Sequence, residues 1–269
     1  MFDEYHFGRF VNQYCAGTYL FDIHPPLGKL TLFFVGKLFG YDHTVCSYNS
    51  ISDPYTSTCK FWVLRATAAV FGSATAPLMY GIARGFGGGI WAGVLCASLF
   101  IFDNLNLTEA RLVLIDSQLI FWCAATLWTA QRWWRRLAED MGAREEKAAE
   151  GDPRLVDARE RNLWCLAMGV TASSAISIKW TALATPGMIA MESFFAFFFL
   201  RRPAYLQDLV KILAVAAVLY FTWFYIHFKL LPKSGAWGAF LASSPRPRLT
   251  RPSTPPPPTH THAHATFRA

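Results

Sequence analysis

Charged residues are scarce in this chain of 269 residues. They make up 16% of the sequence, whereas about 25% is usual for a soluble domain. So few charges cannot cover a soluble globular surface, and the apolar content excludes a disordered chain. The six cysteines include no CxxC pair, so the sequence offers no common metal or redox motif. A glycine-rich nucleotide loop and a DxD motif for sugar nucleotides are also absent from the sequence.

Apolar and aromatic side chains are abundant instead. Hydrophobic residues make up 53% of the chain and aromatic residues 16%, and the mean hydropathy is +0.24. Because roughly 20 apolar residues in a helix cross a bilayer core of about 30 Å, we predict an all-α polytopic membrane protein with about six crossings. The predicted crossings are 61–83, 87–102, 112–131, 163–178, 180–200 and 209–231. A tight reversal at Lys179 separates the fourth crossing from the fifth.

The distribution of Lys and Arg indicates how the chain is oriented. The connections on one side carry twelve of these residues, eight of them within 132–161, and the connections on the other side carry two. Since short cytosolic loops are enriched in Lys and Arg, we place the charged loop 132–161 in the cytosol and both chain ends on the opposite side. We interpret this loop as solvated and partly helical, or as a docking surface. The net charge of +7 then reflects orientation, and we expect no nucleic-acid partner.

Residues 1–60 do not form an ordinary crossing. The apolar run 27–41 is short and is interrupted by two lysines, which predicts an amphipathic helix in the membrane interface. The segment 1–60 is then non-cytosolic, and we expect a crossing to precede Met1 because no apolar anchor stands before it. At the other end, residues 232–269 pass into a Pro/Thr/His tract that cannot pack a core. We interpret this tail as disordered or non-homologous.

Two short motifs in the first segment could carry chemistry. Asp3 and Glu4 are adjacent and point in different directions, so one could act as a general base while the other orients a substrate or cation. The run HPPLGK at 24–29 fixes an extended turn before a helix. Such a helix start, with Lys29, can hold an anion. The simpler interpretations are a surface acid pair and a rigid turn.

Cations also occur at the non-cytosolic ends of the predicted crossings. Arg65, Arg111 and Lys179 are costly at such depths unless they face a cavity or the lipid headgroups. Together with Asp3 and Glu4 they suit a lipid-phosphate donor, whose leaving group needs positive charge, although each arginine could simply snorkel to the headgroups. A glycosylation sequon begins at Asn106 on the same side, close to the bilayer.

A series of longer motifs follows one order along the chain. The motifs are FDEYHFGRF, GTYLFDIHPPLGKL, WVLRATAAVFGSATAPLMYGIAR, FDNLNLTEARLVLIDSQLIFW, SIKWTAL and FYIHFKLLPKSGAWGAF. In this order they resemble the eukaryotic protein O-mannosyltransferases, dolichyl-phosphate-mannose enzymes of the endoplasmic reticulum. The resemblance covers roughly residues 2–240. It implies a GT-C membrane fold with lumenal amphipathic helices and a lumenal active site.

The resemblance further implies transfer of mannose from dolichyl phosphate mannose to Ser/Thr hydroxyls, with inversion at the anomeric carbon. Asp3 matches the catalytic acidic position and would be the general base, with Glu4 as its functional neighbour. Arg65 would bind the donor phosphate, and His24, Lys29 and Arg111 are further candidates for that role. The implied partners are Ser/Thr-rich acceptor proteins, membrane lipids and family members in homo- or heterodimers. No metal site is expected, and a need for a divalent cation stays open.

The chain also departs from the family pattern. Family members start with a cytosolic tail and a first transmembrane helix, and continue into a lumenal MIR domain, so we expect a chain truncated at both ends. This leaves three alternatives to an active mannosyltransferase. They are another GT-C enzyme that uses a polyprenyl-phosphate sugar, an inactive subunit that binds a partner, and a transporter-like bundle.

Overall fold

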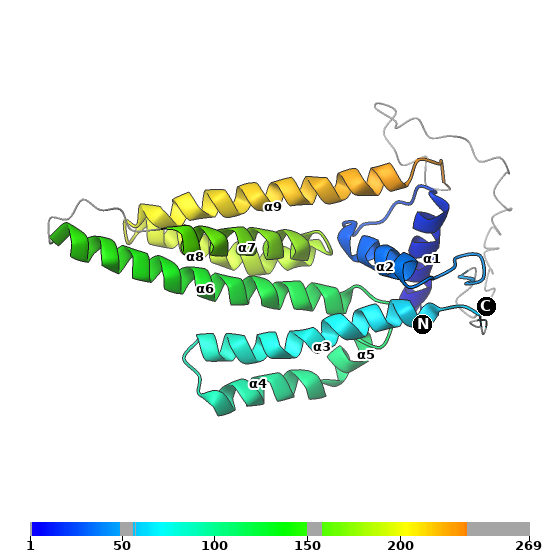
Figure 1. Cartoon of the computed structure of the whole chain (residues 1–269), viewed down its shortest axis with the longest axis horizontal. Helices are drawn as coiled ribbons and strands as arrows, with labels where there is room; N and C mark the ends of the chain where they lie inside the picture. The colour runs from blue at the N-terminus through cyan, green and yellow to red at the C-terminus, as the bar shows by residue number, and fades with distance from the viewer. Residues whose placement is uncertain (1, 49–55, 57, 150–157, 236–269) are drawn as a thin grey trace, which may run out of the picture.

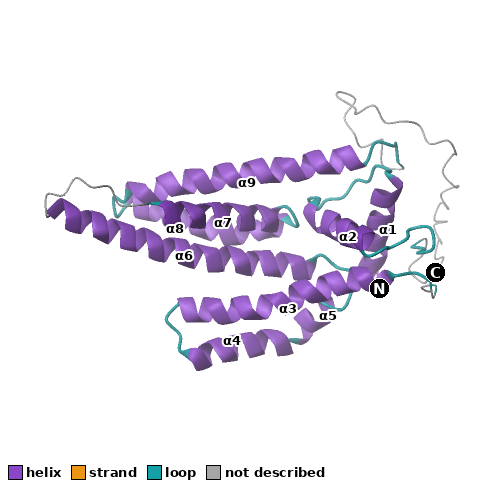
Figure 2. Ribbon diagram, viewed as in Figure 1, coloured by secondary structure: helices purple, strands orange, loops and turns teal. Residues whose placement is uncertain are grey.

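The computed structural model describes residues 2–48, 56, 58–149 and 158–235. Within these residues the chain is helical, and its β-type pairing is a single isolated bridge between Thr18 and Lys233 (Figure 2). The helices are α1 (Phe2–Ala16), α2 (Leu27–Leu38), α3 (Phe61–Gly85), α4 (Ile90–Phe102), α5 (Asn104–Glu109), α6 (Asp116–Ala149), α7 (Arg159–Ile176), the 3₁₀ helix η1 (Trp180–Leu183), α8 (Ala184–Phe198) and α9 (Pro203–Leu230). The predicted all-α fold is confirmed.

The long helices run side by side, and α1 and α2 close one end of the bundle. Helix α3 packs on α4 and α6, and α7 packs on α6 and α9. Helix α1 lies across the bundle axis, with its first turn near the start of α3 and its last turn near the end of α9 (Figure 1). One end of the molecule therefore carries all of the described segment 2–48.

Three stretches of the described chain are long and apolar enough to cross a membrane. They are Phe61–Gly85, Trp180–Phe198 and Pro203–Leu230. Helix α4 is apolar but has only 13 residues, and its Trp91 is 82% exposed, as expected for a side chain that meets lipid rather than protein. The predicted reversal after the fourth crossing is seen between α7 and η1. The total of about six crossings stays a prediction.

The predicted cytosolic loop 132–161 begins as a helix. Helix α6 continues without a break from Asp116 to Ala149, so 18 of the loop's residues extend the preceding crossing. Helix α7 begins at Arg159, and residues 150–157 lie outside the described part. Most of the predicted Pro/His tail, residues 236–269, lies outside it as well.

A compact core joins α1 and α2 to the bundle. Phe7 and Val11 of α1 pack with Leu64 of α3, Ile115 and Ile178 in one buried cluster. The connection after α2 is tied to this layer by the disulfide Cys46–Cys59. Asn12 on α1 donates from Nδ2 to the Cys46 carbonyl at 2.8 Å. Polar bonds and apolar packing thus hold the segment that carries the acidic pair.

Candidate functional site

Glu4 lies in the first turn of α1 and is buried against α3. Its carboxylate accepts two hydrogen bonds from Arg65, from Nε at 2.7 Å and from Nη2 at 2.9 Å. The backbone N–H of Val113 donates a third bond to Oε1 at 3.2 Å. A bidentate arginine pair is both strong and directional. Glu4 therefore fixes the orientation of Arg65 and of the connection before α6.

Asp3 has different surroundings although it is the neighbouring residue. Its side chain is exposed, and it takes part in none of the hydrogen bonds or ion pairs of the described residues. The first turn of α1 also suits a negative charge, because the helix dipole is positive at that end. Arg111, two residues before Val113, is likewise exposed and without an ion pair in the described chain. An unpaired carboxylate and an unpaired guanidinium thus belong to the corner that Glu4 and Arg65 build.

The HPPLGK motif forms the start of α2, and its lysine is turned inward. Lys29 is 1% exposed and donates from Nζ to Asp22 Oδ2 at 2.5 Å and to the His24 carbonyl at 2.7 Å. Burial lowers the pKa of the Lys29 amino group, and the Asp22 carboxylate opposes that shift. The lysine thus stabilises the turn, and its role toward a donor phosphate stays a prediction.

A small cavity lies beside this turn. It has a volume of about 140 Å³, and its lining includes Asp22, His24, Lys29 and His227 of α9. His24 is half-buried, and burial lowers its pKa. His227 shares a hydrogen bond of 2.6 Å between its Nδ1 and the buried Tyr14 hydroxyl of α1. The cavity therefore joins the α1–α2 connection to the end of α9.

His227 and Tyr14 were not among the site residues predicted from the sequence. They are separated by 213 positions, so no local spacing relates them. The available signal was an ionisable residue in the apolar run FYIHF, since such residues usually face a cavity.

The predicted site residues fall into two groups. Asp3, Glu4 and Arg65 lie at the first turn of α1, with Arg111 two residues before the Val113 that bonds to Glu4. His24 and Lys29 lie near the last turn of α1. Asp3 and Tyr14 are eleven positions apart on α1, which is roughly 16 Å along a helix. An ion pair between Lys179 and Asp116 (2.5 Å) lies close to the second group. Both of its charges influence the pKa of His24.

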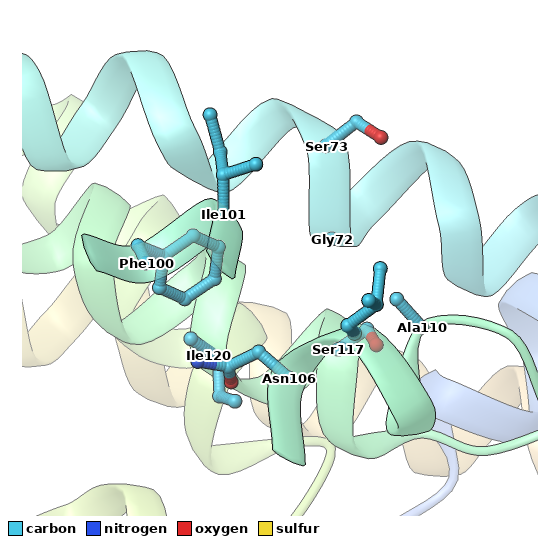
Figure 3. A pocket seen from close by; sticks show the side chains of 9 residues that line it. Gly72, Ser73, Phe100, Ile101, Asn106, Ala110, Ser117 and Ile120 are labelled. Atoms are coloured by element: carbon cyan, nitrogen blue, oxygen red, sulfur yellow. The ribbon is translucent and has the colours of Figure 1, made fainter. Parts of the chain in front are cut away.

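Two further features can be checked in the described residues: a possible metal site and the Asn106 sequon. In that part of the chain no three His, Cys, Asp or Glu side chains are grouped so that they could hold a metal ion. Asn106 lines a mostly apolar cavity of about 120 Å³ among α3, α4, α5 and α6 (Figure 3). The Thr108 hydroxyl of its sequon donates to the Asn104 carbonyl at 2.8 Å. Glycosylation at Asn106 stays untested.

Comparison with known proteins gives a family match over most of the chain. The family model for dolichyl-phosphate-mannose-protein mannosyltransferase matches residues 1–232. Dolichyl-phosphate-mannose–protein mannosyltransferase 4 of Candida albicans is 29% identical over 90% of this chain and 32% of its own length. Mannosyltransferase 1 of Saccharomyces cerevisiae is 28% identical over 95% of this chain and 30% of its own length. The chain thus spans about a third of the relatives it matches.

A solved structure supports the same relationship. One chain of the S. cerevisiae protein O-mannosyltransferase Pmt1-Pmt2 complex, bound to the sugar donor, superposes with a TM-score of 0.74 and 29% identity. The match covers 88% of this chain and 31% of that one. The helical membrane bundle, the ordered motifs and the family model lead to one conclusion. The chain belongs to the dolichyl-phosphate-mannose-protein mannosyltransferase family.

Proposed function

We propose that this chain is the catalytic membrane region of a protein O-mannosyltransferase of the endoplasmic reticulum. It would transfer mannose from dolichyl phosphate mannose to Ser/Thr hydroxyls of secretory proteins at the lumenal face. The observation that supports this most directly is that the two adjacent acids have different surroundings. Glu4 is occupied by Arg65 and Val113, whereas Asp3 is exposed and can accept a proton.

The proposed reaction is a single displacement. The acceptor oxygen attacks the anomeric carbon of mannose, Asp3 takes the hydroxyl proton, and the bond from that carbon to the phosphate oxygen breaks with inversion. Dolichyl phosphate leaves with the electron pair. A positioned general base typically contributes 10²–10⁴-fold to such a step. Because a phosphate is already a good leaving group, nearby cations can replace a general acid.

Arg65 and Arg111 are the cations that we assign to the donor phosphate. Arg65 lies about one-third exposed beside Glu4, so its guanidinium is both oriented and accessible from one side. Arg111 is exposed near the same corner. We assign His24 and Lys29 to shaping the α1–α2 connection beside the donor. By analogy with the Pmt1-Pmt2 complex, we propose that the protein works as a dimer with a family member.

The test is mannosyl transfer by the full chain in proteoliposomes. Radiolabelled dolichyl phosphate mannose is the donor, and a Ser/Thr-rich peptide is the acceptor. We expect Asp3→Asn to lower the rate by roughly 10²–10⁴-fold. Asp42→Asn is the matched control, because Asp42 is an exposed aspartate of the same segment whose carboxylate accepts hydrogen bonds from Thr44 and lies 4.0 Å from His43. A rate unchanged by Asp3→Asn would remove Asp3 from the mechanism.

The same assay separates the alternatives. Label on a lipid or glycan instead of the peptide would indicate a different polyprenyl-phosphate-sugar transferase. Product that forms only with a co-reconstituted full-length relative, and that is insensitive to Asp3→Asn in this chain, would indicate a partner-binding subunit.

A further inference from the structure

Three arginines line a cavity at the end of the bundle opposite α1 and α2. The cavity lies between the last turns of α3 and the middle of α6, and its volume is about 520 Å³. The residues that line it are Tyr80, Gly81, Arg84, Gly85, Arg132 and Arg135. No acidic side chain is among them.

The positive charge of this cavity is not neutralised by the described protein. Arg84 donates from Nη1 to the Gly88 carbonyl at 3.2 Å, and Arg132 lies over the Trp128 ring at 4.8 Å. Neither contact supplies negative charge. Arg84, Arg132 and Arg135 form no ion pair among the described residues. Like charges gathered in one place repel one another, so an anion bound there would stabilise the cluster.

The neighbouring Arg136 differs from the three cavity arginines because it has acidic partners. It pairs with Glu139 at 3.0 Å and also with Asp140 and Glu160. Glu139, Asp140 and Glu160 thus form ion pairs with Arg136, whereas the three cavity arginines form none among the described residues. Among the described residues, the three cavity arginines therefore have no acidic partner, and an added anionic ligand would supply one.

The walls of the cavity are held by close helix packing. A Cβ at Gly81 would lie 2.7 Å from Trp128 Nε1, and one at Gly85 would lie 2.3 Å from Gln131 Oε1. Gln131 Nε2 donates to the Ile82 carbonyl at 3.1 Å. The two glycines thus let α6 approach α3, which places the arginines of both helices around one space.

The depth of the cavity matches a membrane boundary. Arg65 and Arg84 are 19 positions apart on α3, which is roughly 28 Å along the helix, and the hydrocarbon core is about 30 Å thick. If Arg65 lies at one headgroup region, Arg84 lies at the other. The adjacent side chains of Phe86, Ile90 and Trp91 are exposed and apolar, as suits contact with acyl chains.

We propose that this cavity binds the phosphate of an anionic phospholipid, in the leaflet opposite the candidate active site. A guanidinium fork matches two phosphate oxygens, and basic pockets between membrane helices bind anionic headgroups in this way. The phosphate is the group recognised, and the exposed apolar side chains of Phe86, Ile90 and Trp91, which follow Arg84 in the chain, favour a lipid over a free anion. This proposal does not depend on the transferase activity.

The test counts lipids retained by the full chain. The protein is reconstituted in phosphatidylcholine nanodiscs with or without phosphatidylinositol, and bound lipid is measured by native mass spectrometry. We expect about one retained phosphatidylinositol, with binding weakened roughly 5-fold or more for each of Arg84→Gln, Arg132→Gln and Arg135→Gln, because one basic residue contributes about a factor of this size. Arg135 is exposed, so its variant tests the proposal even where loss of the Arg132–Trp128 contact impairs folding.

Arg144→Gln is the matched control. It removes the same charge from an exposed position of α6, outside the cavity, and is expected to leave binding unchanged. Equal losses in the Arg144 and Arg135 variants would overturn a specific site in favour of general charge attraction. Displacement of phosphatidylinositol by millimolar inorganic phosphate would overturn the lipid as the ligand. Equal retention of phosphatidylcholine and phosphatidylinositol would overturn the role of headgroup charge.

Discussion

Glu4 accepts bonds from two segments that are far apart in the chain, α3 and the connection before α6. Its side chain is 5% exposed, so the carboxylate depends on Arg65 for the charge that replaces water. Burying an ionised carboxylate without its partner is strongly unfavourable. The pair therefore stabilises the fold in addition to any role toward the donor.

Replacing Arg65 should reveal this structural contribution. We expect Arg65→Gln to lower the free energy of unfolding by about 2–3 kcal/mol, because a buried charged acceptor loses its bidentate donor. Thermal unfolding of the detergent-solubilised chain measures the change. Arg111→Gln, at an exposed position without an ion pair in the described chain, should stay within about 0.5 kcal/mol. Equal effects of the two variants would contradict the assignment.

The lowered pKa of His24 leads us to expect that the stability of the protein depends on pH. Burial lowers its pKa below the usual value of 6.5, so the folded state favours the neutral imidazole. Above pH 6.5 His24 is neutral in both states and the full stability is present. As the pH falls, the unfolded chain takes up the proton first, and stability is lost down to and through the lower folded pKa.

The measurement is the melting temperature of the wild type and of His24→Gln between pH 7.5 and pH 5. The wild type should lose stability on acidification, and the variant should lose less because it lacks this group. Identical pH profiles for the two proteins would show that His24 does not titrate differently on folding.

At the level of elements, α2 is positioned by its second residue. A Cβ at Gly28 would lie 2.9 Å from Ile115 Cγ2 and 3.3 Å from Ile178 Cγ2. We expect Gly28→Ala to destabilise the protein by about 1–3 kcal/mol through overpacking. Gly142→Ala in α6 has open space around its Cβ and should instead stabilise by about 0.5–1 kcal/mol. Thermal unfolding distinguishes these opposite signs, and a stabilising Gly28→Ala would contradict the packing.

The sequence predicts the apolar helices well and their polar extensions poorly. The crossing expected at 61–83 corresponds to α3 (Phe61–Gly85), but the one expected at 209–231 begins six residues earlier, at Pro203. Hydropathy marks the turns that meet lipid, whereas a helix continues wherever its backbone bonds are satisfied. For the same reason α6 runs on to Ala149. Helix α1 mixes charged and aromatic residues, so no apolar run revealed it.

Across the whole molecule, buried charges join three helices at the end away from α1. Arg161 of α7 lies 3.4 Å from Asp140 of α6 and 3.2 Å from Asp208 of α9. The Trp133 Nε1 of α6 also donates to Asp208 at 3.0 Å. All four side chains are buried. Their partners come from separate elements, so no motif in the sequence indicated this network.

Asp208→Asn should weaken the association of these helices. We expect a loss of about 3 kcal/mol, because Arg161 stays buried with part of its charge uncompensated. Glu139→Gln is the control, since Glu139 is an exposed partner of Arg136 and such pairs contribute about 0–1 kcal/mol. Chemical unfolding of the full chain provides both values, and a larger effect at Glu139 would refute the expectation.

The candidate site was predictable to the extent that its residues share a short motif. The adjacent pair Asp3 and Glu4 marked the acidic corner, and HPPLGK marked the turn before α2. Which acid stays exposed could not be read from the sequence, because that depends on Arg65 and Val113. The inward direction of Lys29 likewise depends on Asp22 and on the packing of α2.

The disulfide between Cys46 and Cys59 also bears on which end of the bundle lies on which side of the membrane. Such bonds persist in oxidising compartments and are rare in the cytosol. We therefore predict that the end of the molecule that carries this bond, together with α1 and α2, faces an oxidising compartment. On this prediction the arginine-lined cavity at the other end faces the reducing side. One covalent bond thus indicates the same orientation as the count of Lys and Arg, from chemistry that is independent of charge.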